Sequence, residues 1–190
     1  MIFETIITTR SIAGKVHIAP MGVREQGGFV ILAPFKPSTT LDNVLAGLCA
    51  VQNFCDDVRV FAGCVTGAQR DWPTIETQIV DSVRLIESLG HSELVLDHVE
   101  DDAQRPKLFC KRKHDAGHGA FRGFNRAQAA VIEASVLVSR LPMLPWEKIS
   151  EEWKYLNIAI EKTAGPCERE AWGWLQAKLE LHRAQQQGQQ

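Results

Sequence analysis

A hydroxyl-rich segment stands where an apolar stretch gives way to a helical pattern. It reads Pro34-Phe35-Lys36-Pro37-Ser38-Thr39-Thr40, and the helix is expected from Thr40 to about Cys49 with Thr39 or Thr40 as its cap. The first N–H groups of a helix have no acceptor within it, so together with hydroxyls and a Lys they can hold a phosphate. Ordinary capping needs only one hydroxyl. Two interpretations are therefore open: a helix cap, or a phosphate site.

A second segment could accept a flat ligand. Residues 18–23 read Ile18-Ala19-Pro20-Met21-Gly22-Val23, an apolar strand interrupted by Pro and Gly. Such an interruption exposes backbone donors and acceptors and allows a ligand to approach closely. A bulge that bends a barrel strand explains the same pattern, so both interpretations stay open.

The residues at the start of a later helix have two interpretations, one of which is a second anion site. Arg122 and Arg126 flank Asn125, which is a plausible N-cap. Arginines beside a helix start can hold an anion. Capping together with surface charge explains the same residues, and we favour that interpretation.

The spacing C-x₃-H-x₃-H of Cys110, His114 and His118 hints at zinc. A helix would be needed to align the three side chains, but Gly117 and Gly119 oppose one, and no fourth ligand has a suitable spacing. We therefore expect an exposed basic strand end followed by a loop, and no metal site.

Short β-branched segments dominate the first part of the chain. Strands are expected at residues 2–9, 15–23, 28–35, 51–55, 82–87, 93–100 and 107–113, with Gly27-Gly28 as a hairpin turn. Residues 56–65 are ambiguous, and we favour a helix capped by Asp56. The links are too short for parallel crossovers, so about six strands should pair antiparallel and close into a small barrel.

The later part of the chain is helical in pattern. Helices are expected at residues 124–141, 146–163 and 167–182, with a frayed tail at 185–190. We thus predict an α+β, mainly β protein: a six-stranded antiparallel split β-barrel over residues 1–118 and a three-helix subdomain over residues 119–190.

Composition restricts the function classes. A net charge of −2 provides no positive field for nucleic acid or an anionic membrane. Five widely spaced cysteines form no C-x-x-C pair, which is typical of reduced thiols and predicts a cytoplasmic protein. The chain has neither a signal-peptide pattern nor an apolar run of the roughly 20 residues that span a bilayer. Dinucleotide and P-loop fingerprints are also missing from it.

Taken in order, several motifs resemble an archaeal and bacterial family, domain of unknown function 447. The resemblance extends from Met1 to about Arg140. It is carried by Glu4-Thr5-Ile6-Ile7-Thr8-Thr9, by residues 18–23, by Pro34-Phe35-Lys36 with Ser38-Thr39-Thr40 and Asn43, by Val51-Gln52-Asn53-Phe54 with Asp56-Asp57 and Phe61, and by Phe124-Asn125-Arg126-Ala127 with Ala130-Val131-Ile132-Glu133-Ala134. That family is similar in fold to the flavin-reductase-like, FMN-binding split barrels.

The resemblance implies a homodimer that binds FMN near its interface. It places the phosphate at Lys36, Ser38, Thr39, Thr40 and Asn43, and the isoalloxazine along Ala19, Pro20, Met21, Gly22 and Val23, with Asn53 and Asp56 nearby. An oxidoreductase that passes electrons between NADH or NADPH and an acceptor follows as the first hypothesis. The alternatives are a non-catalytic flavin-binding or partner-binding protein, and an enzyme for another phosphorylated or pterin-like ligand, with Arg122 and Arg126 as its anion site.

Overall fold

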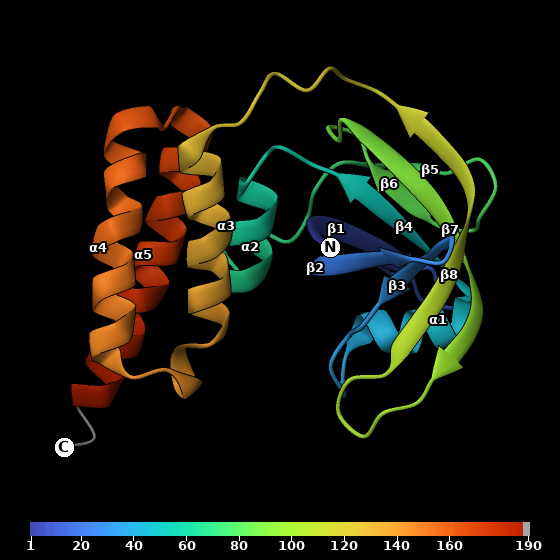
Figure 1. Cartoon of the computed structure of the whole chain (residues 1–190), viewed down its shortest axis with the longest axis horizontal. Helices are drawn as coiled ribbons and strands as arrows, with labels where there is room; N and C mark the ends of the chain where they lie inside the picture. Colours follow the sequence, from blue (N-terminus) through green and yellow to red (C-terminus); the bar gives the residue numbers. More distant parts are fainter. Residues whose placement is uncertain (188–190) are drawn as a thin grey trace. The chain divides into compact units, whose positions relative to one another are not determined.

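The computed structural model describes residues 1–187 and contains two compact units. The first comprises Met1–Asp56 and Trp72–Phe121, and the second comprises residues 57–71 together with the chain from Arg122 onward. The second unit therefore includes a segment, residues 57–71, that lies well before the division at residue 118 expected from the sequence. Figure 1 shows that the first unit consists mainly of strands and the second of helices.

Six antiparallel strands form the main sheet of the first unit. Their order is β1-β2-β3-β8-β7-β4, and β4 pairs in turn with β1, so the ring of pairings closes. The strands are β1 (Ile2–Arg10), β2 (Val16–Gln26), β3 (Phe29–Leu32), β4 (Cys49–Phe54), β7 (Gly90–Glu100) and β8 (Lys107–Gly117).

A short helix and a small second sheet complete this unit. The helix is α1 (Thr39–Gly47), and its buried residues Leu41 and Val44 join the apolar core inside the ring of strands. The second sheet pairs β5 (Thr74–Glu76) with β6 (Val83–Leu85). A strand was expected at residues 82–87 and is present as β6, but its expected place in the main sheet is wrong. No strand was expected where β5 lies. β5 is only three residues long, which leaves almost no periodic pattern to detect.

The turn between β2 and β3 is the predicted glycine hairpin. Gly27 and Gly28 have φ of +59° and +80°, which side chains with a Cβ rarely adopt. β3 is shorter than expected and ends at Leu32, because the chain then turns towards α1.

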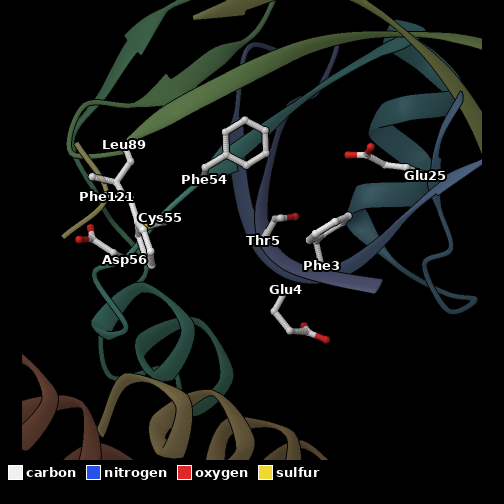
Figure 2. A pocket seen from close by; sticks show the side chains of 9 residues that line it. All are labelled: Phe3, Glu4, Thr5, Glu25, Phe54, Cys55, Asp56, Leu89 and Phe121. Carbon is white, nitrogen blue, oxygen red and sulfur yellow. The ribbon is translucent and has the colours of Figure 1, made fainter. Parts of the chain in front are cut away.

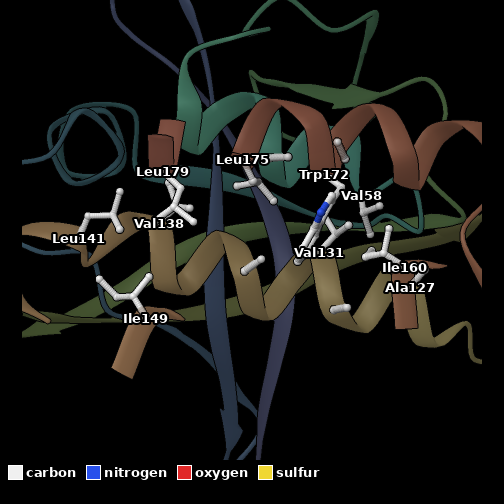
Figure 3. Packing of buried hydrophobic residues seen from close by; sticks show 14 residues of the cluster. Val58, Ala127, Val131, Val138, Leu141, Ile149, Ile160, Trp172, Leu175 and Leu179 are labelled. Atoms are coloured by element: carbon white, nitrogen blue, oxygen red, sulfur yellow. The ribbon is translucent and has the colours of Figure 1, made fainter. Parts of the chain in front are cut away.

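Four helices build the second unit. They are α2 (Arg59–Thr66), α3 (Arg126–Ser139), α4 (Trp146–Thr163) and α5 (Pro166–Gln187), with a 3₁₀ turn at Leu141–Met143. Apolar side chains from all four helices meet in one core, together with Val58, the residue before α2. The core includes Val131 of α3, Ile160 of α4 and Trp172 of α5 (Figure 3). α2 is thus part of the helical core, although the sequence places it between strands.

The helix boundaries correct several expected details. α2 begins at Arg59, and the side chain that accepts the Arg59 N–H is Asp57, at 3.0 Å, where a cap by Asp56 was expected. α5 extends past His182 to Gln187, so the expected tail begins as helix, and residues 188–190 lie outside the described part. No disulfide joins any of the five cysteines, all of which are described. No helix among residues 1–187 combines the length and apolar character needed to cross a membrane.

Candidate functional site

The start of α1 presents the backbone donors that the sequence suggested. Ser38 is extended (φ −154°, ψ 140°), and its Oγ accepts the N–H of Leu41 at 3.1 Å. Ser38 is therefore the cap, and the expectation of Thr39 or Thr40 in that role is wrong. The N–H groups of Thr39 and Thr40 belong to the first turn and have no acceptor within the helix. Two backbone donors thus remain for a ligand.

Only some of the predicted phosphate-binding side chains lie at the surface. Lys36 and Thr39 are exposed, and Ser38 is half-buried. Thr40 and Asn43 are buried, and the Nδ2 of Asn43 donates to the Thr9 hydroxyl at 3.0 Å. Thr40 and Asn43 therefore support the helix from within, and their side chains are not presented to solvent.

The cation of this turn has a carboxylate partner. Lys36 Nζ lies 2.7 Å from Asp101 Oδ1 and 2.9 Å from the carbonyl oxygen of Asp102, both in the connection between β7 and β8. The Lys36 ammonium lowers the pKa of Asp101, mainly through this hydrogen bond. A phosphate here would have to share Lys36 with Asp101.

A second cation reaches the same turn and has no sequence signal. Arg105 donates from Nε to the carbonyl oxygen of Ala33 at 2.7 Å, across 72 positions of the chain. Its guanidinium carbon lies 4.7 Å from the centre of the Phe35 ring. The backbone N–H of Lys36 also bonds to Gln104 O at 2.8 Å, so residues 104–105 lie against residues 33–36. Only the pairing of β3 with β8 brings these segments together.

Residues 19–23 of β2 lie beside an open edge. On one side they pair with β1, and on the other β3 pairs only with Arg24, Glu25 and Gln26. No strand in the described part of the chain pairs with that second side of residues 19–23. Their backbone groups can therefore meet a ligand or another chain.

Gly22 has a structural reason to be glycine. A Cβ at this position would lie 2.9 Å from Ile2 Cγ2 and 3.2 Å from Glu4 Oε1, both on the neighbouring strand β1. The missing side chain therefore permits the close packing of β1, whatever approaches the open edge.

Asn53 is placed inside the protein. Its Nδ2 lies 3.1 Å from both Ile6 O and the Thr8 hydroxyl, and its Oδ1 accepts the N–H of Leu85 at 2.8 Å. Thr8 donates in turn to the carbonyl oxygen of Val83. The two side chains thus join β6 to β1 and β4. Both polar atoms at the end of the Asn53 side chain have partners within the protein, so neither is left to contact the flavin ring near which Asn53 was expected.

Asp56 lies at a mainly apolar pocket of about 370 Å³. In Figure 2, Phe3, Glu4 and Thr5 line one side, Cys55, Asp56, Leu89 and Phe121 line the other, and Phe54 lies between them. Thr5 also pairs with Met21 and donates its hydroxyl to Met21 O at 3.2 Å. The pocket therefore adjoins residues 21–25 of β2.

The predicted site residues thus fall into separate groups. The start of α1 contacts β1 through Thr9, near one end of that strand, whereas the pocket contacts β1 at residues 3–5, near the other. The residues of the second anion site belong to the other unit. There Asn125 accepts the N–H groups of Ala127 at 2.7 Å and Gln128 at 3.3 Å, so it caps α3, while Arg122 and Arg126 are exposed.

The C-x₃-H-x₃-H motif is only partly brought together: the rings of His114 and His118 both lie beside His91, at 5.8 and 5.0 Å between centroids, whereas Cys110 does not join them. Cys110 is buried in the core of the strand ring, and burial raises the pKa of its thiol to about 12. His114 instead pairs in register with Glu93 of β7. Burial raises the pKa of Glu93, but hydrogen bonds from three backbone N–H groups outweigh it and hold that pKa below its usual value.

Solved structures share this fold. An FMN-bound protein of family DUF447 from Methanosarcina mazei matches with a TM-score of 0.80 at 20% identity, covering 93% of this chain and 94% of that chain. A 2-nitrobenzoate 2-nitroreductase from Pseudomonas fluorescens matches at 0.52 and 16%, covering 60% and 64%. A flavoredoxin from Methanosarcina acetivorans matches at 0.52 and 11%, covering 60% and 68%.

Two family comparisons cover the sequence itself, while no curated protein matches it. Residues 3–118 match the N-terminal domain of a protein of unknown function, DUF447, and residues 125–177 match a second DUF447 domain. Because these matches span most of its residues, the chain belongs to the DUF447 family of proteins of unknown function.

Proposed function

We propose that this protein binds FMN on a split barrel and acts as an oxidoreductase of the flavin-reductase-like type. The donors at the start of α1 carry the proposal. The FMN-bound family member and the flavoredoxin of similar fold support it, as does the closed ring of six strands.

The groups at the turn fit a phosphate. Two first-turn N–H groups, the Thr39 hydroxyl, the Lys36 ammonium and the Arg105 guanidinium are all donors, and two of them are positively charged. A phosphate monoester carries only acceptors when ionised, so this donor set is complementary to it. Arg105 supplies the planar fork that Lys36 lacks.

The open edge of β2 fits the polar edge of a ring system. Residues 19–23 offer alternating backbone N–H and C=O groups, except that Pro20 has no N–H to donate. An isoalloxazine presents N–H and C=O groups in one plane, which can pair with such an edge. We place the ring here and a second copy of the chain across it, since an open edge invites a partner.

Bound FMN would supply hydride or single-electron transfer, with NADH or NADPH as the donor and an unidentified acceptor. The chain's part would be to anchor the phosphate and to cover the ring. The mainly apolar pocket that Asp56 helps to line would lie beside the flavin ring and exclude water from it.

The sharpest test uses position 39, which is the first residue of the helix. Proline is well tolerated there and lacks only the N–H, and the extended Ser38 suits a following proline. We expect Thr39→Pro to weaken FMN binding about tenfold or more, because a hydrogen bond to a charged group is worth roughly 1.5–3 kcal/mol. Fluorescence titration of FMN measures the effect.

Two controls separate the phosphate from the fold. Thr39→Ala removes the hydroxyl and keeps the N–H, so it should weaken FMN binding less than Thr39→Pro. Riboflavin lacks the phosphate, so its affinity should be the same for both variants. An equal loss of riboflavin and FMN affinity in Thr39→Pro would place the phosphate elsewhere.

Enzyme activity and assembly have their own readouts. Anaerobic NADH or NADPH should bleach the visible absorbance of the bound flavin. Tight FMN binding without bleaching would favour the non-catalytic alternative.

A sedimentation experiment on the full chain should give a homodimer, and a monomer would leave the edge of β2 to the ligand alone.

A further inference from the structure

Two histidines and a glutamate lie on one face of two neighbouring strands. His91 and Glu93 are two positions apart on β7, so their side chains point to the same face. His114 of β8 lies directly opposite Glu93 in the antiparallel register. Strand geometry alone therefore converges the three side chains, although His114 is 21 or more positions away in the sequence.

The distances suit a metal ion. One ligand atom from each of the three side chains lies within 4.8 Å of the other two. His91 Nε2 and Glu93 Oε1 are 3.4 Å apart, which is longer than an ordinary N–H···O hydrogen bond. Two ligand atoms of a tetrahedral zinc ion, each about 2.0–2.1 Å from the metal, would lie roughly 3.4 Å from each other.

One nitrogen of the His114 ring, Nε2, is buried and has no hydrogen-bond partner within the described residues. Buried polar atoms of this kind are rare in native structures and call for an explanation, one of which is an ion. It lies beside an almost fully buried imidazole and a fully buried carboxylate, so a cation at this point would satisfy all three groups.

The other atoms of these side chains are held as in metal sites. His91 Nδ1 lies 2.8 Å from His118 Nε2, and a proton on Nδ1 would leave the Nε2 lone pair directed at Glu93. Glu93 accepts the N–H groups of Gln78, Ile79 and Val80 at 2.9, 2.7 and 2.9 Å. Such outer partners orient the ligands of a metal.

Of the three side chains, His91 lines a pocket of about 580 Å³, whereas Glu93 is fully buried and His114 is half-buried. Three protein ligands leave the fourth position of a tetrahedral zinc ion to a water molecule.

We propose that His91, Glu93 and His114 bind one Zn²⁺ per chain, with His118 as the outer partner of His91. The ligand set of two imidazoles and one carboxylate suits zinc. The ion would join β7 to β8 and, through Glu93, to residues 78–80 before β6.

The test is a Zn²⁺ titration of the chelator-treated, flavin-free full chain against a chromophoric chelator. We expect one bound Zn²⁺ per chain. His114→Ala should lower the affinity at least about 100-fold, since losing only an outer partner costs roughly 10–100-fold. His118→Ala should fall within that smaller range, and His182→Ala, which changes a histidine in α5, should bind like the parent.

Folding of the key variant is a small risk, because His114 Nε2 has no partner to lose. His114→Phe keeps an aromatic ring at the position and repeats the test. X-ray absorption on the parent then identifies the ligands, with nitrogen and oxygen at about 2.0–2.2 Å and sulfur at about 2.3 Å.

Three results would overturn the proposal. They are the absence of bound Zn²⁺, undiminished binding in both His114 variants, and a sulfur ligand from one of the five cysteines. FMN titration is a separate measurement on other residues, so the zinc site and the flavin site can fail independently.

Discussion

Polar side chains that attract attention in a sequence often serve the fold. Asn53 was expected near the flavin ring, and Asn125 was expected as a helix cap, with an anion site as the less favoured alternative. In the structure Asn53 fastens β6 to its neighbours, and Asn125 caps α3. The groups that remain for a phosphate are of two kinds. The first-turn N–H groups of α1 have no acceptor within the helix, and the partners of Lys36 and Arg105 lie at the surface.

The ion pair between Lys36 and Asp101 makes a prediction about FMN affinity. Removing the carboxylate charge in Asp101→Asn should leave Lys36 without its carboxylate partner and reduce the repulsion of a phosphate. Because an exposed charge pair contributes little and is screened by solvent, we expect FMN to bind only about two- to fivefold more tightly at low salt. Titration at two salt concentrations measures this, and the gain should shrink at high salt.

Asp97→Asn is the matched control for that measurement. Asp97 lies on β7, four positions before Asp101, and also pairs with a lysine, Lys111, so the variant makes the same change in net charge. An equal gain in both variants would reveal a general charge effect. An unchanged affinity in Asp101→Asn would remove Lys36 from the phosphate site.

At the scale of elements, the cap of α3 carries its own prediction. Asn125→Ala should lower the free energy of unfolding of the helical unit by about 1–2 kcal/mol, because two first-turn N–H groups lose their acceptor. Arg126→Ala, at the next and exposed position, should change it by less than about 0.5 kcal/mol. Chemical denaturation followed by circular dichroism compares them. An equal loss of stability in Asn125→Ala and Arg126→Ala would argue against a capping role for Asn125. If inorganic phosphate stabilised the parent and neither variant, that result would support the second anion site.

Elements with a long regular pattern were predictable from the sequence. The bounds of α4 were correctly expected at 146–163, because its apolar residues repeat every three or four positions. Those of β1 differ by one residue, because its β-branched residues favour a strand. The Gly27-Gly28 turn was predictable because positive φ leaves few residue types to choose from. β5 and the exact cap of α1 were not, because three residues carry no period and three adjacent hydroxyls can all cap.

Contacts between residues far apart in the sequence could not be predicted from the sequence alone. Arg105 reaches the α1 turn, and His114 meets Glu93, only because particular strands pair in a particular register. The spacing of Cys110, His114 and His118 led us to expect no metal site, and a register irregularity between Glu93 and Leu94 lies between the pairings of Cys110 and His114. A shift of one residue turns side chains to the opposite face of a sheet, so sequence spacing alone cannot specify such a cluster.

At the scale of the whole molecule, two cores share one chain that passes between them more than once. The strand unit has its own apolar cluster, and the helical unit has another that includes Val58 and Ala62 from residues 57–71. The net charge of −2 does not describe either site, because phosphate donors and candidate zinc ligands are local arrangements of a few groups.

This division predicts where a core mutation is felt. Val58→Ala and Val44→Ala each remove two methyl groups from an almost fully buried side chain, and each should cost about 1–3 kcal/mol. Val58 precedes α2 by one position in the helical core, whereas Val44 lies in α1 in the strand core. Native-state hydrogen exchange should therefore accelerate in α3 and α5 for Val58→Ala, and in β4 and β7 for Val44→Ala. Acceleration of β4 by Val58→Ala, with α3 unaffected, would mean that residues 57–71 are stabilised by the strands and that the helical core is complete without them.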